Sequence, residues 1–176
     1  EFEKTPEMEL IGKVYKMALA QYQEKNERDA REALPIIKDV YENPSNMYQR
    51  IVVPFSDGIK TLNVVTDLQK AYESEGKQLV NDFEKNITLA IVDEAWKKHL
   101  RKMDELKQSV QLAVHEQKDP LLIYKFEAFN LFKAMLTNVN KDVVSFLFKG
   151  DLPNRNNNAV QEAVEVRQKE DYTTSK

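Results

Sequence analysis

Large apolar residues recur at three- and four-residue steps from Phe83 to Phe148, in two runs separated by a short polar stretch. This spacing places side chains on one stripe of a helix, so each run predicts a long amphipathic helix. The first stripe consists of Leu89, Val92, Trp96, Met103, Leu106 and Val110, and the second of Leu122, Phe126, Phe129, Phe132, Leu136, Val139, Val143 and Phe146. Two facing stripes with a short connection predict an antiparallel helical hairpin, roughly 40 Å long at 1.5 Å per residue.

The connection between the two predicted helices is a polar tip, Val114–Lys118. Asp119 and Pro120 follow it. Asp can accept hydrogen bonds from the first N–H groups of a helix, and Pro at the first helical position gives up no hydrogen bond. The second helix is therefore expected to begin at this pair.

The preceding region, residues 1–82, predicts a smaller helical wing. Apolar positions indicate one helix from Glu7 to about Asn26 and another from Ala30 to Tyr41, with the charged cluster 24–29 interrupting them. Pro35 should bend the second helix or mark its first turn, because Pro removes a backbone donor.

A β-hairpin is predicted within the wing, at about residues 48–65. The runs Tyr48–Phe55 and Ile59–Val65 are rich in β-branched residues and flank Ser56-Asp57-Gly58. Asp-Gly between such runs is a strong hairpin signal, because Gly accepts the positive φ of the turn. Pro54 cannot donate to a ladder and belongs on an edge or at a bulge.

After the β-hairpin, Thr66 and Gln69 have the spacing of a capping box, so a helix is expected to start near Asp67. The helix could break at Gly76 or run through it into the first arm of the hairpin. Gly inside a helix costs only about 1 kcal/mol, and we expect a nearly continuous helix.

The chain ends in a polar segment, residues 151–176. Gly150 and Pro153 should end the second arm, since both residues commonly follow a helix. The segment could hold a short helix around 159–168, but its polarity favours a linker or frayed tail. The predicted fold class is mainly α: a long antiparallel helical hairpin at 83–150, with a smaller helical wing at 1–82 that carries one β-hairpin.

Composition narrows the classes of function. The 176 residues carry a net charge of −3, which gives no electrostatic case for binding nucleic acid. The chain has no cysteine, which excludes disulfides and thiolate zinc sites. No apolar run approaches the roughly 20 residues needed to span a bilayer. The chain does not begin with Met, and we expect it to be part of a longer protein.

Catalytic chemistry finds little support. The two histidines are His99 and His115, and His99 lies one helical turn after Trp96, as a packed histidine beside an aromatic would. The sequence lacks a phosphate-binding glycine loop and the paired Glu-x-x-His motifs of di-iron bundles. We expect no enzymatic activity and no cofactor in this chain itself.

The aromatic residues of the second arm admit two interpretations. They could form the core of the hairpin, or part of the stripe could dock on a neighbouring domain outside this chain. Burial of a Phe is worth roughly 1.5–3 kcal/mol, so some element is expected to cover the stripe.

Several blocks in fixed order resemble the C-terminal region of the SecA family. They are Asp93-Glu94-Ala95-Trp96-Lys97-Lys98-His99-Leu100, Met103-Asp104-Glu105-Leu106-Lys107-Gln108-Ser109-Val110, Gln117-Lys118-Asp119-Pro120, Tyr124-Lys125-Phe126-Glu127-Ala128-Phe129 and Phe132-Lys133-Ala134-Met135-Leu136. Within them, the residues that carry the family pattern as structural positions are Trp96, His99, Met103, Asp104, Asp119, Pro120 and Phe129. Residues 7–41 are weakly similar to the family's helical wing, whereas the β-hairpin looks like an insertion.

The resemblance implies a fragment of the ATP-driven motor of bacterial preprotein translocation. It implies that the ATP and magnesium sites lie in domains upstream, and that a zinc module lies beyond the tail. The hairpin would be the family's two-helix finger, which regulates the ATPase. Its partners would be the SecYEG channel, the preprotein and the remaining SecA domains, and the protein would be cytoplasmic and peripherally associated with the inner membrane.

By the same resemblance, the tip of the finger contacts preprotein and channel, which assigns that contact to Ala113, Val114, His115, Glu116 and Gln117. The family usually has a basic residue and then an aromatic where this chain has Ala113 and His115. An imidazole offers a planar face and hydrogen bonds but less apolar area than Tyr, and it can gain charge near neutral pH. His115 could equally be a solvated loop residue. The alternative for the whole chain is an unrelated all-helical module for protein–protein interaction.

Overall fold

The computed structural model describes residues 6–43, 48–112, 119–152 and 161–162. The element order is α1 (Glu7–Glu42), β1 (Arg50–Ser56), β2 (Thr61–Asp67), α2 (Leu68–Glu73), α3 (Lys77–Leu112), α4 (Pro120–Lys149) and β3 (Gln161–Glu162). The predicted class, mainly α with one β-hairpin, is confirmed. Within the described ranges, no helix combines the length and the hydropathy that a membrane span requires.

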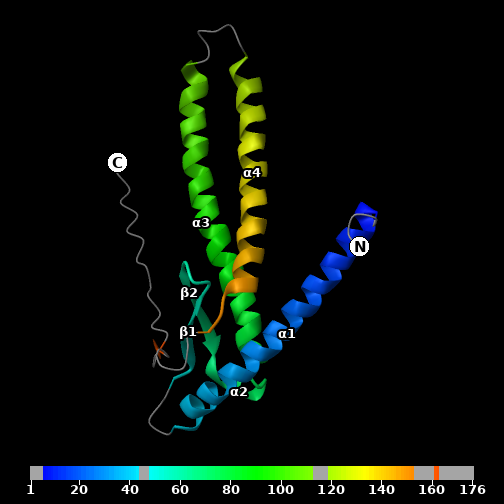
Figure 1. The fold of residues 1–176 in the computed structure, drawn as a ribbon. Coiled ribbons are helices and arrows are strands. Elements are labelled where there is room, and N and C mark those ends of the chain that lie inside the picture. Colours follow the sequence, from blue (N-terminus) through cyan, green and yellow to red (C-terminus); the bar gives the residue numbers. More distant parts are fainter. Residues whose placement is uncertain (1–5, 44–47, 113–118, 153–160, 163–176) are drawn as a thin grey trace, which may run out of the picture.

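The helices α3 and α4 run side by side as the predicted antiparallel hairpin (Figure 1). The predicted start of α4 is confirmed: the Asp119 carboxylate accepts hydrogen bonds from the backbone N–H groups of Leu121 at 2.9 Å and Leu122 at 3.4 Å. Pro120 occupies the first turn. The start of α4 is therefore specified locally, by two adjacent residues.

The seam between the arms differs from the predicted stripes. The more shielded positions on the two helices are Ile91, Ala95, His99, Met103, Leu106 and Val110 on α3, and Ala128, Leu131, Met135, Val139, Val143 and Phe146 on α4. The predicted stripe is right for Met103, Leu106 and Val110, and for Val139, Val143 and Phe146. It is wrong for the others, Leu89, Val92, Trp96, Leu122, Phe126, Phe129, Phe132 and Leu136, which are exposed.

The physical reason for this shift is the size and polarity of the seam residues. Ala95 and Ala128 are small and let the two helices approach closely, and His99 is a buried polar ring. The adjacent positions carry the large apolar residues Trp96 and Phe129, whose hydropathy dominates a pattern based on size. Because successive residues are 100° apart on a helix, the seam lies about a third of a turn from the predicted stripe at Trp96 and Phe129, whereas the two coincide at Met103 and Val139.

The predicted break in the first helix is wrong, because α1 is a single helix from Glu7 to Glu42. The charged cluster 24–29 lies within it. Lys25 and Asp29 are one turn apart, both are buried, and they form an ion pair. Two charges that neutralise each other in this way do not interrupt a helix. Pro35 also lies inside α1.

The predicted β-hairpin is confirmed. Strands β1 and β2 pair antiparallel, with Val52 opposite Val65, and the loop 57–60 joins them. Gly58 has φ 85°, as the Asp-Gly signal requires. The short strand β3, which was not predicted, pairs with the opposite edge of β1 at Ile51 and Val52. Residues 153–160 and 163–176 of the predicted tail lie outside the described residues.

The expected continuous helix through Gly76 is wrong. The helix α2 ends at Glu73, and α3 begins at Lys77. Glu75 and Gly76 both have positive φ, at 54° and 86°. The Gly76 N–H donates to the Ala71 carbonyl at 2.8 Å and the Glu75 N–H to the Tyr72 carbonyl at 3.1 Å. This is the hydrogen-bond pattern of a Schellman motif, which ends a helix.

The capping box predicted at Thr66 is also wrong. The residue that caps α2 is Asp67, whose carboxylate accepts from the Lys70 N–H at 3.0 Å. Thr66 belongs to β2, and its buried hydroxyl donates to the Asp82 carboxylate at 2.8 Å. The Thr66 side chain thus ties the sheet to α3 and is not available as a cap.

The helix α4 ends before Gly150, as predicted, but Gly150 does not adopt the left-handed conformation that usually explains glycine after a helix. The helix ends at Lys149, but Gly150 has φ −68° and is not left-handed. A Cβ on Gly150 would lie 2.8 Å from the carbonyl oxygen of Phe146. Close approach to the preceding turn, rather than positive φ, explains glycine at this position.

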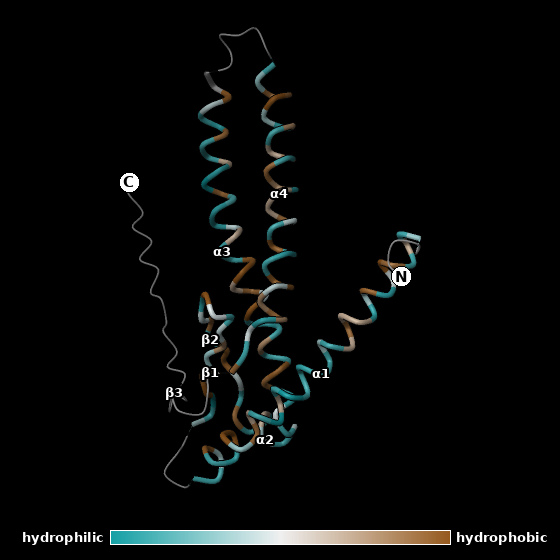
Figure 2. Tube along the Cα trace, viewed as in Figure 1, coloured by the Kyte–Doolittle hydropathy of each residue, from teal (hydrophilic) through white to brown (hydrophobic). Residues whose placement is uncertain are grey.

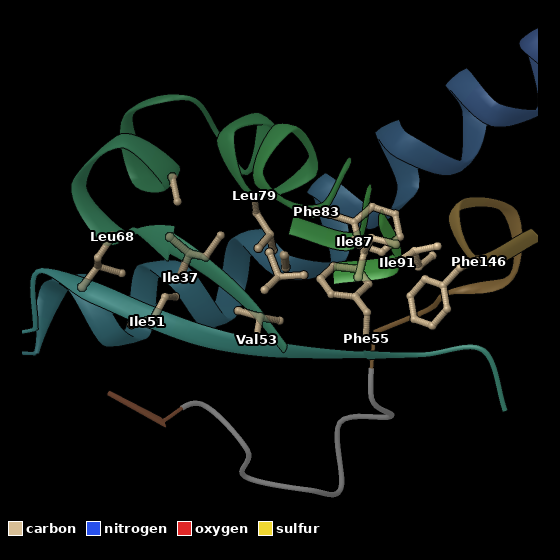
Figure 3. Close-up of a cluster of buried hydrophobic side chains, with 13 residues drawn as sticks. Ile37, Ile51, Val53, Phe55, Leu68, Leu79, Phe83, Ile87, Ile91 and Phe146 are labelled. Atoms are coloured by element: carbon tan, nitrogen blue, oxygen red, sulfur yellow. The ribbon is translucent and has the colours of Figure 1, made fainter. Parts of the chain in front are cut away.

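The hydrophobic core lies at one end of the hairpin, which we call the foot. Figure 3 shows side chains from α1, β1, α2, α3 and α4 converging there. The buried set comprises Ala33, Ile37, Ile51, Val53, Phe55, Val64, Leu68, Ala71, Leu79, Phe83, Ile87, Ile91 and Phe146. The sheet and α1 therefore support the base of the α3–α4 pair, and the pair extends away from them (Figure 1).

Candidate functional site: an anchored two-helix rod

The foot holds both arms of the hairpin through a row of aromatic rings. The Phe83 ring of α3 lies 4.3 Å from the Phe55 ring of β1 and 6.3 Å from the Phe146 ring of α4, measured between centroids. All three side chains are 1% exposed. Aromatic pairs at these separations add to the stability that burial provides. The strand and the two arms are thus joined at one point.

A second contact fixes α1 against the foot. The buried ion pair of Lys25 and Asp29 faces the core, and the Lys25 ammonium lies 5.2 Å from the centroid of the Phe83 ring. Arg28 donates to the carboxylate of Asp151, just beyond α4, at 2.8 Å. A buried charge requires a partner, so these contacts specify how α1 is seated on the foot.

Tyr22 extends this contact along α1. Its hydroxyl donates to the Glu84 carboxylate of α3 at 2.9 Å, and its ring lies 5.2 Å from that of Phe148 on α4. Burial, followed by the hydrogen bond to Glu84, raises the pKa of the Tyr22 hydroxyl. The hydroxyl therefore remains a donor at all physiological pH values.

Beyond the foot, one face of the rod exposes large apolar side chains. Val92, Trp96 and Leu100 each follow a seam residue of α3 by one position, as Phe129, Phe132 and Leu136 do on α4. Because the arms are antiparallel, the same one-residue step rotates toward the same side of the pair on both helices. We call this surface the apolar face. Figure 2 shows hydrophobic positions along α4 well beyond the sheet.

The apolar face has no cover among the described residues. Trp96 is 45% exposed and Phe129 is 62% exposed. Contiguous exposed apolar surface of this kind marks an interaction site. Of the two interpretations of the aromatic stripe, the core interpretation is wrong for these residues. Docking outside this chain stays a prediction.

The residues that carried the family pattern occupy different environments. His99 is buried in the seam, Met103 is partly buried there, and Asp104 is exposed. Trp96 and Phe129 lie on the apolar face, and Asp119 and Pro120 form the start of α4. The expected tip residues, Ala113, Val114, His115, Glu116 and Gln117, lie outside the described residues.

His99 is flanked by two aromatic rings. Its centroid lies 5.5 Å from that of Trp96 and 5.9 Å from that of Phe132, so the expected packing beside Trp96 is confirmed. The side chain is 7% exposed, and its Nδ1 has no hydrogen-bond partner in the described part of the chain. No acidic or nucleophilic group pairs with it there, so the imidazole lacks the partner that a catalytic base requires.

Within the described ranges, no group of three or more His, Asp or Glu side chains is arranged so that it could hold a metal ion. The magnesium and zinc implied by the family resemblance are therefore assigned no residue here.

Sequence reasoning missed the contacts that fix the rod to its foot. The pair Lys25 and Asp29 carried a signal, since opposite charges four residues apart favour a helix, but its burial depends on packing against α3. The role of Asp151 in holding Arg28 had no local signal, because the two residues are far apart in sequence.

Comparisons with known proteins agree with the residue blocks described above. Residues 3–151 match the family model described as the SecA Wing and Scaffold domain. The whole chain is similar to the protein translocase subunit SecA of Flavobacterium psychrophilum, at 73% identity, and of Christiangramia forsetii, at 63%. The chain is also 46% identical to the protein translocase subunit SecA of Bacteroides thetaiotaomicron, over an alignment that covers 96% of the chain. The chain spans 16% of the length of each of these relatives. No solved structure matches the chain.

Proposed function

We propose, from the premise that this chain belongs to the SecA wing and scaffold family, that it serves as a mechanical and regulatory part of an ATP-driven preprotein translocation motor. The observation that carries this proposal is the α3–α4 rod itself. Its foot is fixed in the core, and its far end leads into the connection 113–118. This arrangement suits the transmission of a push from one end to the other.

Pairing along the seam gives the rod the stiffness that such a role demands. Two helices joined along their length resist bending better than either helix alone, because bending must shear the packed seam as well as distort each helix. The foot then provides the fixed end: Phe55, Phe83 and Phe146 join both arms to the sheet.

The apolar face is the surface by which the rod couples to the rest of the motor under this proposal. The relatives are several times longer than this chain, so much additional protein is available to cover Trp96 and Phe129. ATP and magnesium would bind in those other domains, and zinc in a module beyond the tail. The further partners are the SecYEG channel and the preprotein, and the motor would act in the cytoplasm at the inner membrane.

The alternative of an unrelated helical interaction module is wrong, because the family match covers residues 3–151. Within the family, the apolar face still makes this part of the chain an interaction surface. The mechanical role and a binding role are therefore compatible.

The tip assignment can be tested in the full-length motor with His115→Gly, which removes the imidazole from the connection between the arms. Preprotein transport into vesicles that contain SecYEG is expected to fall several-fold, while ATP hydrolysis without preprotein is retained. The matched control is Ile59→Gly, because Ile59 is 90% exposed in the loop of the β-hairpin. Transport at the parental rate with His115→Gly would contradict the assignment of the tip.

A further inference from the structure

The side of the rod opposite the apolar face carries a groove between α3 and α4, with a volume of about 480 Å³. The groove residues Glu94, Lys98 and Lys102 each precede a seam residue of α3 by one position. The residues of the apolar face each follow a seam residue by one position. The two surfaces therefore lie on opposite sides of the seam. Lys60, from the loop of the β-hairpin, reaches the end of this groove nearer the foot.

The rim of the groove is positively charged. Lys60, Lys98, Lys102 and Lys141 line it, and they face only two carboxylates, Glu94 and Asp142, which leaves a net charge of +2. Lys98 donates to Glu94 at 2.6 Å. Among the described residues, no ion pair joins Lys60, Lys102 or Lys141 to a carboxylate. The ammonium groups of Lys102 and Lys141 thus remain available to an anionic occupant. The Lys60 ammonium lies 5.6 Å from the centroid of the Phe146 ring and can still accept a carboxylate as a partner.

The floor of the groove is apolar and made of small or flexible side chains. Ala95 comes from α3, and Ala134 and Met135 come from α4. His99 also lines the groove, and its buried Nδ1 lacks a partner within the described residues.

These features favour a polypeptide over a phosphate group. Phosphate sites use backbone N–H groups at helix N-termini or the planar fork of Arg. The groove lies midway along two helices, whose N–H groups are bonded internally, and it contains no Arg. Its α3 wall runs from Ile91 to Lys102, which is about three helical turns. An apolar floor with a basic rim complements an amphipathic helix with acidic flanks.

We propose that this groove docks an acidic amphipathic helix of a partner protein. Carboxylates of the docked helix pair with Lys60, Lys102 and Lys141, and small apolar residues of the helix lie on the floor. The β-hairpin lies within the family match over residues 3–151, so the interpretation of it as an insertion is wrong. It supplies Lys60 and so completes the rim. This inference rests on the groove alone and stands independently of the mechanical role proposed above.

The test uses the 176-residue chain and a synthetic 14-residue helical peptide, with Glu on both flanks of an Ala/Leu stripe. Isothermal titration at low ionic strength is expected to show binding, and a peptide with Gln at every Glu position is expected to bind about tenfold more weakly. Binding of the Glu peptide should weaken as salt is raised, because exposed charges are screened. Equal affinity of the Glu and Gln peptides would overturn the proposal.

Lysine variants of the chain test whether the Glu peptide binds in the groove. The double variant Lys102→Gln/Lys141→Gln is expected to lower the affinity for the Glu peptide by about tenfold. Lys133→Gln is the matched control, since Lys133 is an exposed lysine of α4 outside the groove. Circular dichroism checks that all variants keep the parental helix content. An equal loss of affinity with Lys133→Gln would show non-specific attraction and would overturn the proposal.

A final experiment distinguishes the docking of an acidic helix from the binding of any small anion. Inorganic phosphate is titrated in place of the peptide, at the same ionic strength. No saturable binding of phosphate is expected at millimolar concentration. Saturable binding that is lost in Lys102→Gln/Lys141→Gln would identify a phosphate site and contradict the docking of an acidic helix.

Discussion

Gly76 occupies a position where the backbone tolerates glycine and disfavours other residue types. Its φ of 86° disfavours any residue with a side chain, and a Cβ there would lie 2.5 Å from the carbonyl oxygen of Ala30 in α1. We predict that Gly76→Ala lowers the free energy of unfolding by about 2–4 kcal/mol, from left-handed strain and a backbone clash. Urea denaturation followed by circular dichroism measures the loss.

Gly12 is the matched control for Gly76. It lies inside α1 with nothing within 4 Å of an added Cβ. Ala is the better helix former, so Gly12→Ala should raise the stability of α1 by up to about 1 kcal/mol. Equal effects of the two substitutions would show that the contact between Gly76 and Ala30 is not made.

Asp57 supplies a pH-dependent contribution to the β-hairpin. Its carboxylate accepts hydrogen bonds from the N–H groups of Lys60 at 2.8 Å and Ile59 at 2.9 Å. The Lys60 N–H contributes most, and the pKa of Asp57 is lowered in the folded chain. We predict that Asp57→Ala costs about 0.5–1.5 kcal/mol at pH 7.

The pH dependence follows from the direction of that pKa shift. A carboxylate with a lowered folded pKa adds stability that is fully present above its unfolded pKa of about 3.9, and that is lost as the pH falls through the folded value. The difference in unfolding free energy between the parent and Asp57→Ala should therefore shrink below about pH 4. A difference that stays constant from pH 7 to pH 3 would contradict the role of the carboxylate.

Single residues were predictable where the cause is local. Asp119 with Pro120, and Asp57 with Gly58, act on their immediate neighbours, and both pairs could be recognised from sequence. Thr66 could not be interpreted correctly, because Asp82 of α3 decides its role. The helix end at Gly76 is local, through hydrogen bonds to Ala71 and Tyr72, but the approach of Ala30 from α1 could not be predicted. The same distinction explains why the burial of Lys25 was missed.

Among the elements, α4 carries both a buried and an exposed aromatic side chain. Phe146 is 1% exposed and packs in the foot, whereas Phe129 lies on the apolar face. We predict that Phe146→Ala costs about 3–5 kcal/mol, and that Phe129→Ala changes the stability of the isolated chain by no more than about 0.5 kcal/mol. Thermal or urea unfolding of the two variants checks the contrast.

Comparable losses for both variants would show that the apolar face is covered within this chain. The contrast also reverses a conclusion that hydropathy alone suggests, since large aromatic residues at helical spacing predict a core. Periodicity located both helices and their pairing correctly. It could not locate the seam at Ala95, His99 and Ala128, because these side chains are smaller or more polar than the adjacent Trp96 and Phe129.

At the scale of the whole molecule, the seating of α1 on the foot depends on the buried pair of Lys25 and Asp29. Asp29→Ala would leave the buried Lys25 ammonium with only the more distant carboxylate of Asp151, at 3.9 Å. We predict a loss of about 3–5 kcal/mol for this variant. The double variant Lys25→Met/Asp29→Leu, which removes both charges and keeps the volume, should cost less than Asp29→Ala alone.

Chemical denaturation of the two variants measures this difference. If Asp29→Ala were as stable as the parent, the pair would be solvated and α1 would not be fixed by it. The arrangement of α1, sheet and hairpin around one core was beyond sequence reasoning, because it depends on contacts between distant segments. The mainly helical class, the hairpin and the β-hairpin were within its reach.

On this account, α3 and α4 form one stiff rod that is fixed at its foot. Because the chain contains no cysteine, spin labels can be placed at Gln69→Cys on α2 and Lys125→Cys near the far end of α4, both exposed positions. Pulsed electron paramagnetic resonance then measures the distribution of distances between the two labels. We predict a single narrow peak, whereas a broad or two-peaked distribution would show that the arms separate or pivot on the foot, and would contradict the claim.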